Sequence, residues 1–308
     1  MRDVSSKPNT LRTAKACAEL ICSPATIEAI KSGNVPKADP LGVARVAAIQ
    51  AAKNTSLLIP YCHQVPLDFV NVDCELQSDS IRVTTEVKAV WKTGVEMEAV
   101  TAASAAALTL YDMLKIIDDS MEIRSVKLLN KKGGKSDYVA PEMQLVRAAV
   151  LVLSDSAAAG TRTDKSGKAI VERLESFGLT AIEYKILSDD QHELRQELLR
   201  LADTANVDLV FTTGGTGLSR RDTTPEATES ILDRTLPGVS ERLRSFGQER
   251  NRRAMLSRAT AGVRGRTLIV NLPGSVNAVN ESLDVLLPWL FHSFAMMKGG
   301  GHEERVGK

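Results

Sequence analysis

Val207-Asp-Leu-Val-Phe-Thr-Thr-Gly-Gly-Thr-Gly217 is an apolar run that opens directly into a glycine-rich loop. The run is typical of a buried strand, and the glycines let backbone N–H groups approach an anion with no Cβ in the way. The loop leads to Asp222 and Thr224-Pro225, which suits the first turn of a helix, and a helix N-terminus attracts negative charge. The segment therefore predicts a phosphate site at the end of a strand. Its hydroxyl donors are expected to be Thr212, Thr213, Thr216 and Ser219.

The segments around this loop alternate between strands and helices. Apolar runs predict strands at about 147–153, 181–187, 207–211 and 267–271. Helices are predicted at about 166–177, 191–205, 225–233 and 239–250, followed by a helical C-terminal region. This alternation favours an α/β domain with a doubly wound parallel sheet. Ligands of such sheets bind beyond the carboxyl ends of the strands, which is where the glycine loop falls.

The first half of the chain has the pattern of an α+β domain, which we expect to be ferredoxin-like. Asp39-Pro40 suits the start of a helix, and Pro60 prevents its continuation. Helices are predicted at about 39–58 and 95–117, and strands at about 70–76, 81–87 and 123–129. Residues 137–144 have no periodicity. The predicted limits are a first domain at 1–138, a linker at 139–145 and a second domain at 146–308.

Composition excludes several classes of protein. The chain has 308 residues and 43% hydrophobic content, enough to build a core for each of two domains. Its 39 basic and 38 acidic residues are balanced in both halves and aromatic residues make up 4%, so we expect no nucleic-acid partner. No apolar stretch of about 18 residues could span a membrane and no apolar signal core opens the chain, which predicts a cytoplasmic protein. The four cysteines are Cys17, Cys22, Cys62 and Cys74, and none of them forms a C-x-x-C pair. Their spacing therefore indicates neither a zinc site nor a disulfide framework.

Acidic residues close to the phosphate loop indicate a metal ion. Asp189 follows the predicted strand 181–187, and Asp222 follows the glycine loop. Carboxylates beside a phosphate site would repel the substrate unless a divalent cation lay between them, so these two residues suggest Mg²⁺. The alternative is that each aspartate only caps the helix that follows it.

Three groups of residues make the second half recognisable. They are Thr212-Thr-Gly-Gly-Thr-Gly217 with Arg220-Arg-Asp-x-Thr-Pro225, Leu256-Ser-Arg-Ala-Thr-Ala-Gly262, and Asn271-Leu-Pro-Gly274. Over about 146–300 the chain resembles the molybdopterin adenylyltransferase family. The resemblance implies a domain that adenylylates molybdopterin with ATP and Mg²⁺, with Asp189 and Asp222 as catalytic residues and metal ligands. It also implies substrate contacts from Asp155, Gly214, Gly215, Thr216, Gly217, Ser219, Ser257, Pro273 and Gly274, with Ser257 near the pterin.

Two observations leave an alternative open for this half. Val276 stands where many members of the family have proline, two residues after the Asn-Leu-Pro-Gly glycine. Some relatives of the fold also bind pterin without measurable adenylyl transfer. The alternative is therefore that the C-terminal half is a non-catalytic pterin-binding or assembly module.

Charged residues of the first half could converge from loops and helices. Asp112 and Lys115 lie three apart on one predicted helix and so share a face, although a surface ion pair is the usual reason for that spacing. A single histidine such as His63 is more often packed or solvated than catalytic. Lys131-Lys-Gly-Gly-Lys135 is a stronger signal, because glycines among lysines let the chain wrap a phosphate with charge and backbone donors.

The first half also resembles a known family, over about residues 3–136. The motifs are Ile59-Pro-Tyr-Cys-His63, Lys92-Thr-Gly-Val-Glu-Met-Glu-Ala99, Thr101-Ala-Ala-Ser104, Leu110-Tyr-Asp-Met-Leu-Lys115 and Gly133-Gly-Lys-Ser136. In order and spacing they are similar to cyclic pyranopterin monophosphate synthase. That family rearranges 3′,8-cyclo-7,8-dihydro-GTP into cyclic pyranopterin monophosphate and releases pyrophosphate, and no cofactor is expected for it.

This rearrangement requires several proton transfers, and the resemblance suggests which residues perform them. Lys37 and Lys115 are the expected proton shuttles and Asp112 their partner, because a lysine whose pKa is lowered by burial or neighbouring cations can act as acid and base near neutrality. The substrate-binding positions are Tyr61, Cys62, His63, Met97 and Glu98, and the triphosphate candidates are Lys53, Lys132 and Lys135. The chain departs from the family at Gln64, where proline is common, and at Ala38-Asp39-Pro40, where Gly-Asp-Val is common.

Both resemblances imply a homo-oligomer. The synthase family forms hexamers with active sites at subunit interfaces and the transferase family forms trimers, so a trimer or a hexamer is expected. The chain would then be a bifunctional enzyme of molybdenum cofactor synthesis, with pterin and nucleotide substrates and with other enzymes of that synthesis as partners. Sulfur insertion lies between the two reactions, so the product of the first domain is not the substrate of the second.

Overall fold

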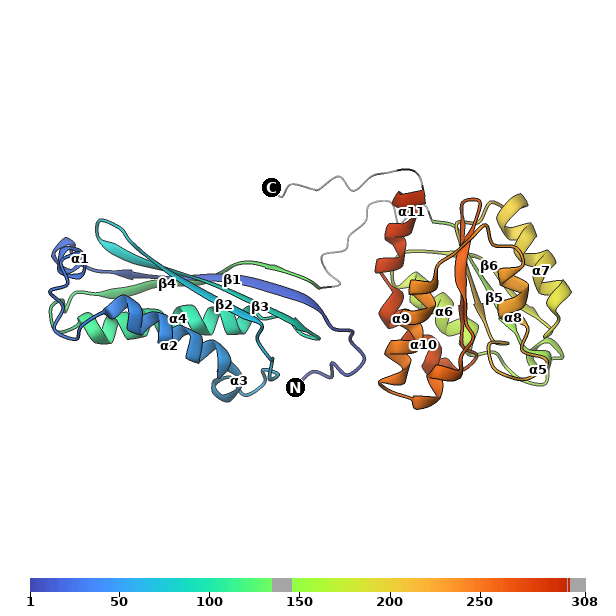
Figure 1. The fold of residues 1–308 in the computed structure, drawn as a ribbon, viewed down its shortest axis with the longest axis horizontal. Coiled ribbons are helices and arrows are strands. Elements are labelled where there is room, and N and C mark those ends of the chain that lie inside the picture. Colours follow the sequence, from blue (N-terminus) through green and yellow to red (C-terminus); the bar gives the residue numbers. More distant parts are fainter. Residues whose placement is uncertain (135–145, 298, 300–308) are drawn as a thin grey trace. The chain divides into compact units, whose positions relative to one another are not determined.

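The computed structural model describes residues 1–134, 146–297 and 299, and these form two compact units on either side of the break after residue 134. Each unit has its own sheet (Figure 1). Each also has its own hydrophobic cores. The predicted linker, 139–145, lies outside the described residues, so the predicted domain limits stay a prediction.

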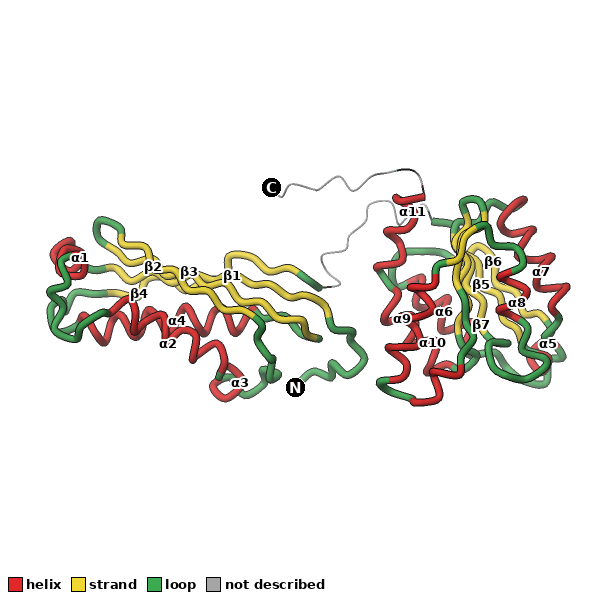
Figure 2. The backbone as a smooth tube through the Cα atoms, viewed as in Figure 1, coloured by secondary structure: helices red, strands yellow, loops and turns green. Residues whose placement is uncertain are grey.

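The first unit is a four-stranded antiparallel sheet with its helices packed on one face (Figure 2). Its elements are β1 (Thr10–Ile21), α1 (Pro24–Lys31), α2 (Pro40–Lys53), α3 (Thr55–Leu58), β2 (Phe69–Leu76), β3 (Ser80–Trp91), α4 (Glu96–Leu114) and β4 (Glu122–Lys132). The strand order is β2-β3-β1-β4, and every neighbouring pair is antiparallel. An antiparallel sheet with its helices on one face confirms the predicted α+β class.

Small side chains allow α4 to lie close to the sheet. Ala14, Ala16 and Ala18 alternate along β1 and are fully buried. They pack against Ala99, Ala103 and Ala107, which share one face of α4 at helical spacing. These small side chains therefore let the helix and the sheet approach each other closely.

Two predictions for the first unit need correction. Strand β1 was not predicted, because its alanines have low strand propensity although they occupy the centre of the sheet. The helix expected to reach Leu58 ends at Lys53, and a separate turn, α3, follows Asn54. Asn54 has φ −109° and ψ 12°, outside the helical region, and its side chain donates to the carbonyl of Gln50 at 2.9 Å.

Asp118 ties the chain after α4 to the start of α1. Its carboxylate accepts hydrogen bonds from the Ser23 backbone N–H (2.7 Å), the Thr26 hydroxyl (2.8 Å) and the Ser120 hydroxyl (2.7 Å). Burial alone would raise the pKa of Asp118, but these bonds outweigh it and hold the pKa well below its usual value of 3.8. The ionised form of Asp118 therefore stabilises the folded state.

We expect Asp118→Ala to lower the free energy of unfolding of the first unit by about 3 kcal/mol at pH 7, because buried donors lose their acceptor. The folded pKa is depressed, so the stabilisation is present above the unfolded pKa and is lost as pH falls below it. The difference between wild type and variant should therefore shrink below about pH 4 in urea unfolding series. A difference that stayed constant down to pH 2 would contradict the assigned role of the anion.

The second unit has a six-stranded sheet in the order β6-β5-β7-β10-β9-β8. Its strands are β5 (Ala148–Leu153), β6 (Ala181–Leu187), β7 (Leu209–Thr213), β8 (Arg234–Thr235), β9 (Ala261–Arg264) and β10 (Thr267–Leu272). Its helices are α5 (Asp155–Ala158), α6 (Ser166–Glu175), α7 (Gln191–Leu199), α8 (Thr224–Glu229), α9 (Pro237–Gln248), α10 (Val276–Leu286) and α11 (His292–Met297). Its shorter turns are η3 (Arg200–Thr204), η4 (Arg252–Leu256) and η5 (Trp289–Phe291).

Helices cover both faces of this sheet (Figure 1). On one face α6, α9, α10 and α11 pack around Phe211, and on the other α7 and α8 pack around Leu151 and Ile269. The α/β class and the doubly wound arrangement are therefore confirmed. The predicted parallel sheet is confirmed for β6, β5, β7 and β10, but the whole sheet is mixed, because β9 runs antiparallel to both β10 and β8.

Candidate functional site

The glycine loop of the second unit follows β7 as predicted, and its glycines are required by close contacts. Gly214 and Gly215 have φ of 103° and 64°, in the region that favours glycine. A Cβ on Gly214 would lie 2.2 Å from the carbonyl oxygen of Leu153, and one on Gly215 would lie 2.2 Å from Oγ1 of Thr224. Gly274 completes the packing, because its Cβ position lies 3.4 Å from the Cα of Gly214.

Two of the four predicted hydroxyl donors are used within the protein. The Thr212 hydroxyl accepts from Nδ2 of Asn271 at 2.9 Å, and the Thr213 hydroxyl donates to the carbonyl of Pro273 at 2.8 Å. Both side chains are fully buried, because the strand continues to Thr213 rather than ending at Phe211. The prediction that they face a ligand is therefore wrong, and Thr216 and Ser219 remain as candidate donors.

Three carboxylates gather at the edge of the sheet beside this loop. The Asp155 N–H donates to Oδ2 of Asp189 (3.2 Å), and the Asp189 N–H donates to Oδ1 of Asp155 (3.0 Å). Arg221 donates to Oδ1 of Asp155 at 2.7 Å. Burial raises the pKa of Asp189, and the charges of Asp155 and Asp222 raise it further, while the charge of Arg221 opposes them. The region around Asp189 therefore carries an excess of negative charge.

The capping alternative for Asp189 and Asp222 is wrong. The N-cap of α7 is Asp190, whose carboxylate accepts from the Glu193 N–H at 2.8 Å. Helix α8 begins after Thr223 without a side-chain cap. The carboxylate of Asp222 instead accepts from the Ser219 N–H at 2.7 Å and closes the turn 219–222.

A pocket of about 780 Å³ lies next to the loop, between η4 and the start of α10. Of the predicted substrate-binding residues, those that line it are Thr216, Gly217, Ser257 and Pro273. The carboxylate group and Gly214, Gly215, Ser219 and Gly274 lie outside it. Val276 lines the pocket at the first residue of α10, where the hydroxyl of Ser275 accepts from the Ala278 N–H at 3.3 Å. This N-cap fixes the helix start without the proline that many family members have.

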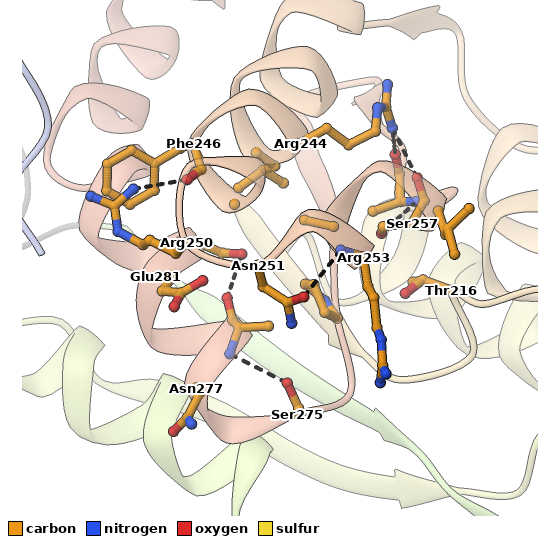
Figure 3. A pocket seen from close by; sticks show the side chains of 18 of the residues that line it. Thr216, Arg244, Phe246, Arg250, Asn251, Arg253, Ser257, Ser275, Asn277 and Glu281 are labelled. Atoms are coloured by element: carbon orange, nitrogen blue, oxygen red, sulfur yellow. Dashed lines mark hydrogen bonds between the residues drawn. The ribbon is translucent and has the colours of Figure 1, made fainter.

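Sequence reasoning missed the basic wall of the pocket, which α9 and the following turn supply (Figure 3). Arg244 donates to the carbonyls of Ser257 (3.4 Å) and Ala259 (3.1 Å). The guanidinium carbon of Arg250 lies 3.5 Å from the ring centroid of Phe246. The run 249–253, with three arginines, was the available signal, but a charge run on its own usually marks a solvated surface.

In the first unit, the structure brings the predicted proton-transfer residues together. Nζ of Lys37 lies 2.9 Å from Oδ2 of Asp112, and Nζ of Lys115 lies 2.7 Å from Oδ1. The hydrogen bond from Lys115 lowers the pKa of Asp112 to about 2, with a further contribution from Lys37. The hydrogen bond to Asp112 raises the pKa of Lys115, so the expected lowering is wrong for this arrangement. The cause is that Lys115 is exposed and paired with an anion rather than buried among cations.

A second group of predicted residues lies at the opposite end of α4. Glu98 is only 4% exposed, and burial raises its pKa. Burial and the nearby charge of Glu98 raise the pKa of the Cys62 thiol, and Nε2 of His63 lies 2.8 Å from the carbonyl oxygen of Arg2. Tyr61 and Met97 are exposed beside this group, and Lys53 ends α2 nearby because α2 and α4 run antiparallel.

The two groups do not meet within a single protomer, because they lie at opposite ends of α4. Glu98 and Asp112 are 14 residues apart on α4, which corresponds to about 21 Å along the helix axis.

Of the other two lysines predicted to bind the triphosphate, Lys132 ends β4 and is exposed. The next residue, Gly133, has φ 106° and a Cβ position 1.8 Å from the carbonyl oxygen of Leu11. Lys135 lies outside the described residues.

These features indicate a protein of two domains. Each domain carries a cluster of charged and polar side chains that suits an anionic ligand. Residues 1–134 match the MoaC family, and residues 149–292 match the probable molybdopterin binding domain. The chain is 44% identical over 302 residues to the molybdenum cofactor biosynthesis bifunctional protein of Chlorobaculum tepidum, covering 98% of this chain and 96% of that protein. A protein of the same description from Synechococcus elongatus is 39% identical, with 98% of both chains covered. The chain therefore belongs to the molybdenum cofactor biosynthesis bifunctional proteins.

Both predicted resemblances are thereby confirmed. A solved structure of the molybdopterin biosynthesis enzyme MoaB from Thermus thermophilus is 42% identical, covers 50% of this chain and 97% of its own, and has a TM-score of 0.48. Within residues 1–134, 146–297 and 299, none of the helices is both long and apolar enough to cross a bilayer.

Proposed function

We propose that the second unit transfers AMP from Mg-ATP to molybdopterin, and that the first unit converts 3′,8-cyclo-7,8-dihydro-GTP into cyclic pyranopterin monophosphate and pyrophosphate. For the second unit, the observation that carries the proposal is the position of Asp189 and Asp222. Both flank the glycine-rich loop that follows β7, and neither caps a helix. A protein that needed these residues only for stability would have no reason to gather negative charge there.

The donor set fits Mg²⁺ that arrives with the nucleotide. Among the residues that the structure describes, no three His, Cys, Asp or Glu side chains are grouped so as to hold a metal ion by themselves. Mg²⁺ is commonly held by one or two carboxylates together with substrate phosphates. Asp189 and Asp222 would provide those carboxylates, and the ion would neutralise phosphate charge. Asp155, which pairs with Arg221 and with the Asp189 backbone, would orient Asp189.

We expect Mg²⁺ alone to leave the melting temperature of the second unit unchanged, because the carboxylates do not form a complete site. Mg-ATP at a hundredfold excess over its dissociation constant should raise it by about 5 °C or more. Differential scanning calorimetry with and without EDTA measures both effects. An equal shift with Mg²⁺ alone would indicate a metal site built by the protein and would contradict the proposal.

The pocket is the proposed site of the pterin. It lies against Thr216 and Gly217 of the glycine loop and against Ser257, so a pterin held there would lie beside the nucleotide phosphates. Arg244 fixes the backbone on both sides of Arg258, and Arg250 with Phe246 forms the far wall. A basic, half-apolar wall suits a pterin that carries a phosphate.

We infer that the first unit is ferredoxin-like and acts as an oligomer. Lys115, Asp112 and Lys37 would move protons at one end of α4, while Glu98, Cys62 and His63 would contact substrate from the other end. Since about 21 Å separates these ends in one protomer, a complete site needs one end from each of two protomers. The exposed apolar residues on the helical side, such as Val46, Leu57 and Leu108, support such an interface.

The alternative is that the second unit only binds pterin or supports assembly. Product analysis of the intact chain with each substrate in turn separates the two functions. Molybdopterin with Mg-ATP should give an AMP-linked product and pyrophosphate, and the cyclo-nucleotide should give cyclic pyranopterin monophosphate. A chain that binds molybdopterin tightly but forms no AMP-linked product would establish the binding module instead.

A further inference from the structure

Arg258 joins two loops of the second unit that carry different parts of the proposed site. Its own loop also carries Ser257, which lines the pocket. The other loop, 216–222, begins in the pocket wall and ends at Asp222. The backbone N–H of Arg258 donates to the carbonyl of Thr216 at 3.0 Å, which joins the two loops at the pocket.

The guanidinium of Arg258 reaches the far end of the second loop. Nε donates to the carbonyl of Gly217 at 2.8 Å, Nη2 donates to the backbone carbonyl of Asp222, and Nη1 pairs with the carboxylate of Glu226 on α8. The two carbonyls bracket the loop, so its ends are held by one rigid planar group. Arginine suits this task because its donors point in several fixed directions, whereas lysine offers a single charged point.

A second arginine, Arg244, binds the segment 257–259 that carries Arg258. Arg244 on α9 donates to the carbonyls of Ser257 and Ala259, the two neighbours of Arg258. A continuous set of contacts therefore runs from the pocket wall through residues 257–259 to the backbone of Asp222. Charge-assisted bonds of this kind are short and directional, so a shift of residues 257–259 would move the Asp222 loop.

We propose that Arg258 is a positioning residue that keeps the Asp222 loop aligned with the pocket. The inference rests on the proposed function, because the alignment would be between a pterin in the pocket and a nucleotide phosphate near Asp222. Arg258 acts through the backbone of Gly217 and Asp222 rather than through either ligand. Its loss should therefore reduce turnover more than binding, since misplacement by about 1 Å can cost a hundredfold in rate.

Hydrogen exchange of the full-length chain tests this without relying on activity. Without ligand, amides of 217–222 should exchange about tenfold faster in Arg258→Met than in wild type. With molybdopterin bound, protection should spread from 257–259 to 217–222 in wild type and stop at 257–259 in the variant. The matched control is Arg264→Met, because Arg264 forms a similar fork with Asp203 and the Ile231 carbonyl outside the pocket lining. Equal exchange of 217–222 in wild type and Arg258→Met would overturn the inference.

Kinetics provide the second readout. In Arg258→Met the kcat of adenylyl transfer should fall about a hundredfold, with both KM values within about threefold of wild type. Arg258→Lys should not restore kcat, whereas methylguanidinium added to Arg258→Ala should restore it at least in part. A loss confined to KM would overturn the inference. A wild-type chain that makes no AMP-linked product, or binds no molybdopterin, would refute the proposed function, and the ligand-free exchange rates would still decide the role of Arg258.

Discussion

Replacing Asp222 with asparagine is expected to lower adenylyl transfer about a hundredfold or more and to leave the synthase reaction of the first unit unchanged. Asparagine has the same shape, and its side-chain oxygen can still accept the Ser219 N–H that Asp222 accepts at 2.7 Å. The turn is therefore kept and only the negative charge is lost. The rate of AMP-linked product formation measures the effect, and conversion of the cyclo-nucleotide by the same preparation is the internal reference.

The matched control is Asp190→Asn. Asp190 is also an aspartate at this edge of the sheet, but it caps α7 through the Glu193 N–H, and asparagine caps a helix equally well. This variant should retain wild-type transfer, whereas Asp189→Asn should behave like Asp222→Asn. If Asp222→Asn kept more than about a third of wild-type activity, the carboxylate of Asp222 would have no part in the reaction.

Sequence periodicity located the elements of the second unit where burial is uniform. Strands β5, β7 and β10 are buried along their whole length, so each contains a run of consecutive apolar residues. Periodicity failed for β8 and β9, which have two and four residues and therefore show no measurable period. Their antiparallel pairing makes the sheet mixed, and pairing direction is a tertiary property.

The sequence motifs located the candidate site, but they did not predict the hydrogen-bond partners of its side chains. Glycines at 214 and 215 were expected to let an anion approach the backbone, whereas the structure shows that they make room for Leu153 and Thr224 of the protein itself. The buried hydroxyls of Thr212 and Thr213 were misassigned, because their partners Asn271 and Pro273 are about 60 residues away in sequence. Contacts between such distant residues depend on strand order, which local patterns do not encode.

In the first unit, too, local sequence motifs did not predict which site residues lie close together. Motif order suggested one set of active-site residues, and the Lys37, Asp112 and Lys115 cluster does assemble. The length of α4 nevertheless places Glu98 about 21 Å from Asp112. A helix of this length is rigid, so no movement within one protomer would bring its two ends together. The proposed oligomer would bring the missing end from a second protomer.

Mixing two inactive variants of the first unit, Lys115→Ala and Glu98→Gln, is therefore expected to restore about a quarter of wild-type synthase activity. Each variant lacks a group at one end of α4. In a two-fold symmetric pair, every site takes one end of α4 from each protomer. Random pairing makes half of the pairs mixed, and one of the two sites in each mixed pair is intact. Formation of cyclic pyranopterin monophosphate after subunit exchange, or after co-expression with two tags, measures the recovery.

The control for this experiment mixes Lys115→Ala with Asp112→Asn. Both changes affect the same end of α4, so every site in a mixed pair lacks one of the two groups and activity should stay absent. Recovery only in the Lys115→Ala and Glu98→Gln mixture would establish a site shared between protomers. Absence of recovery from mixed oligomers of confirmed composition would mean that the two ends of α4 do not serve one site. Glu98, which is buried and whose pKa burial raises, would then need a role other than substrate contact at a shared site.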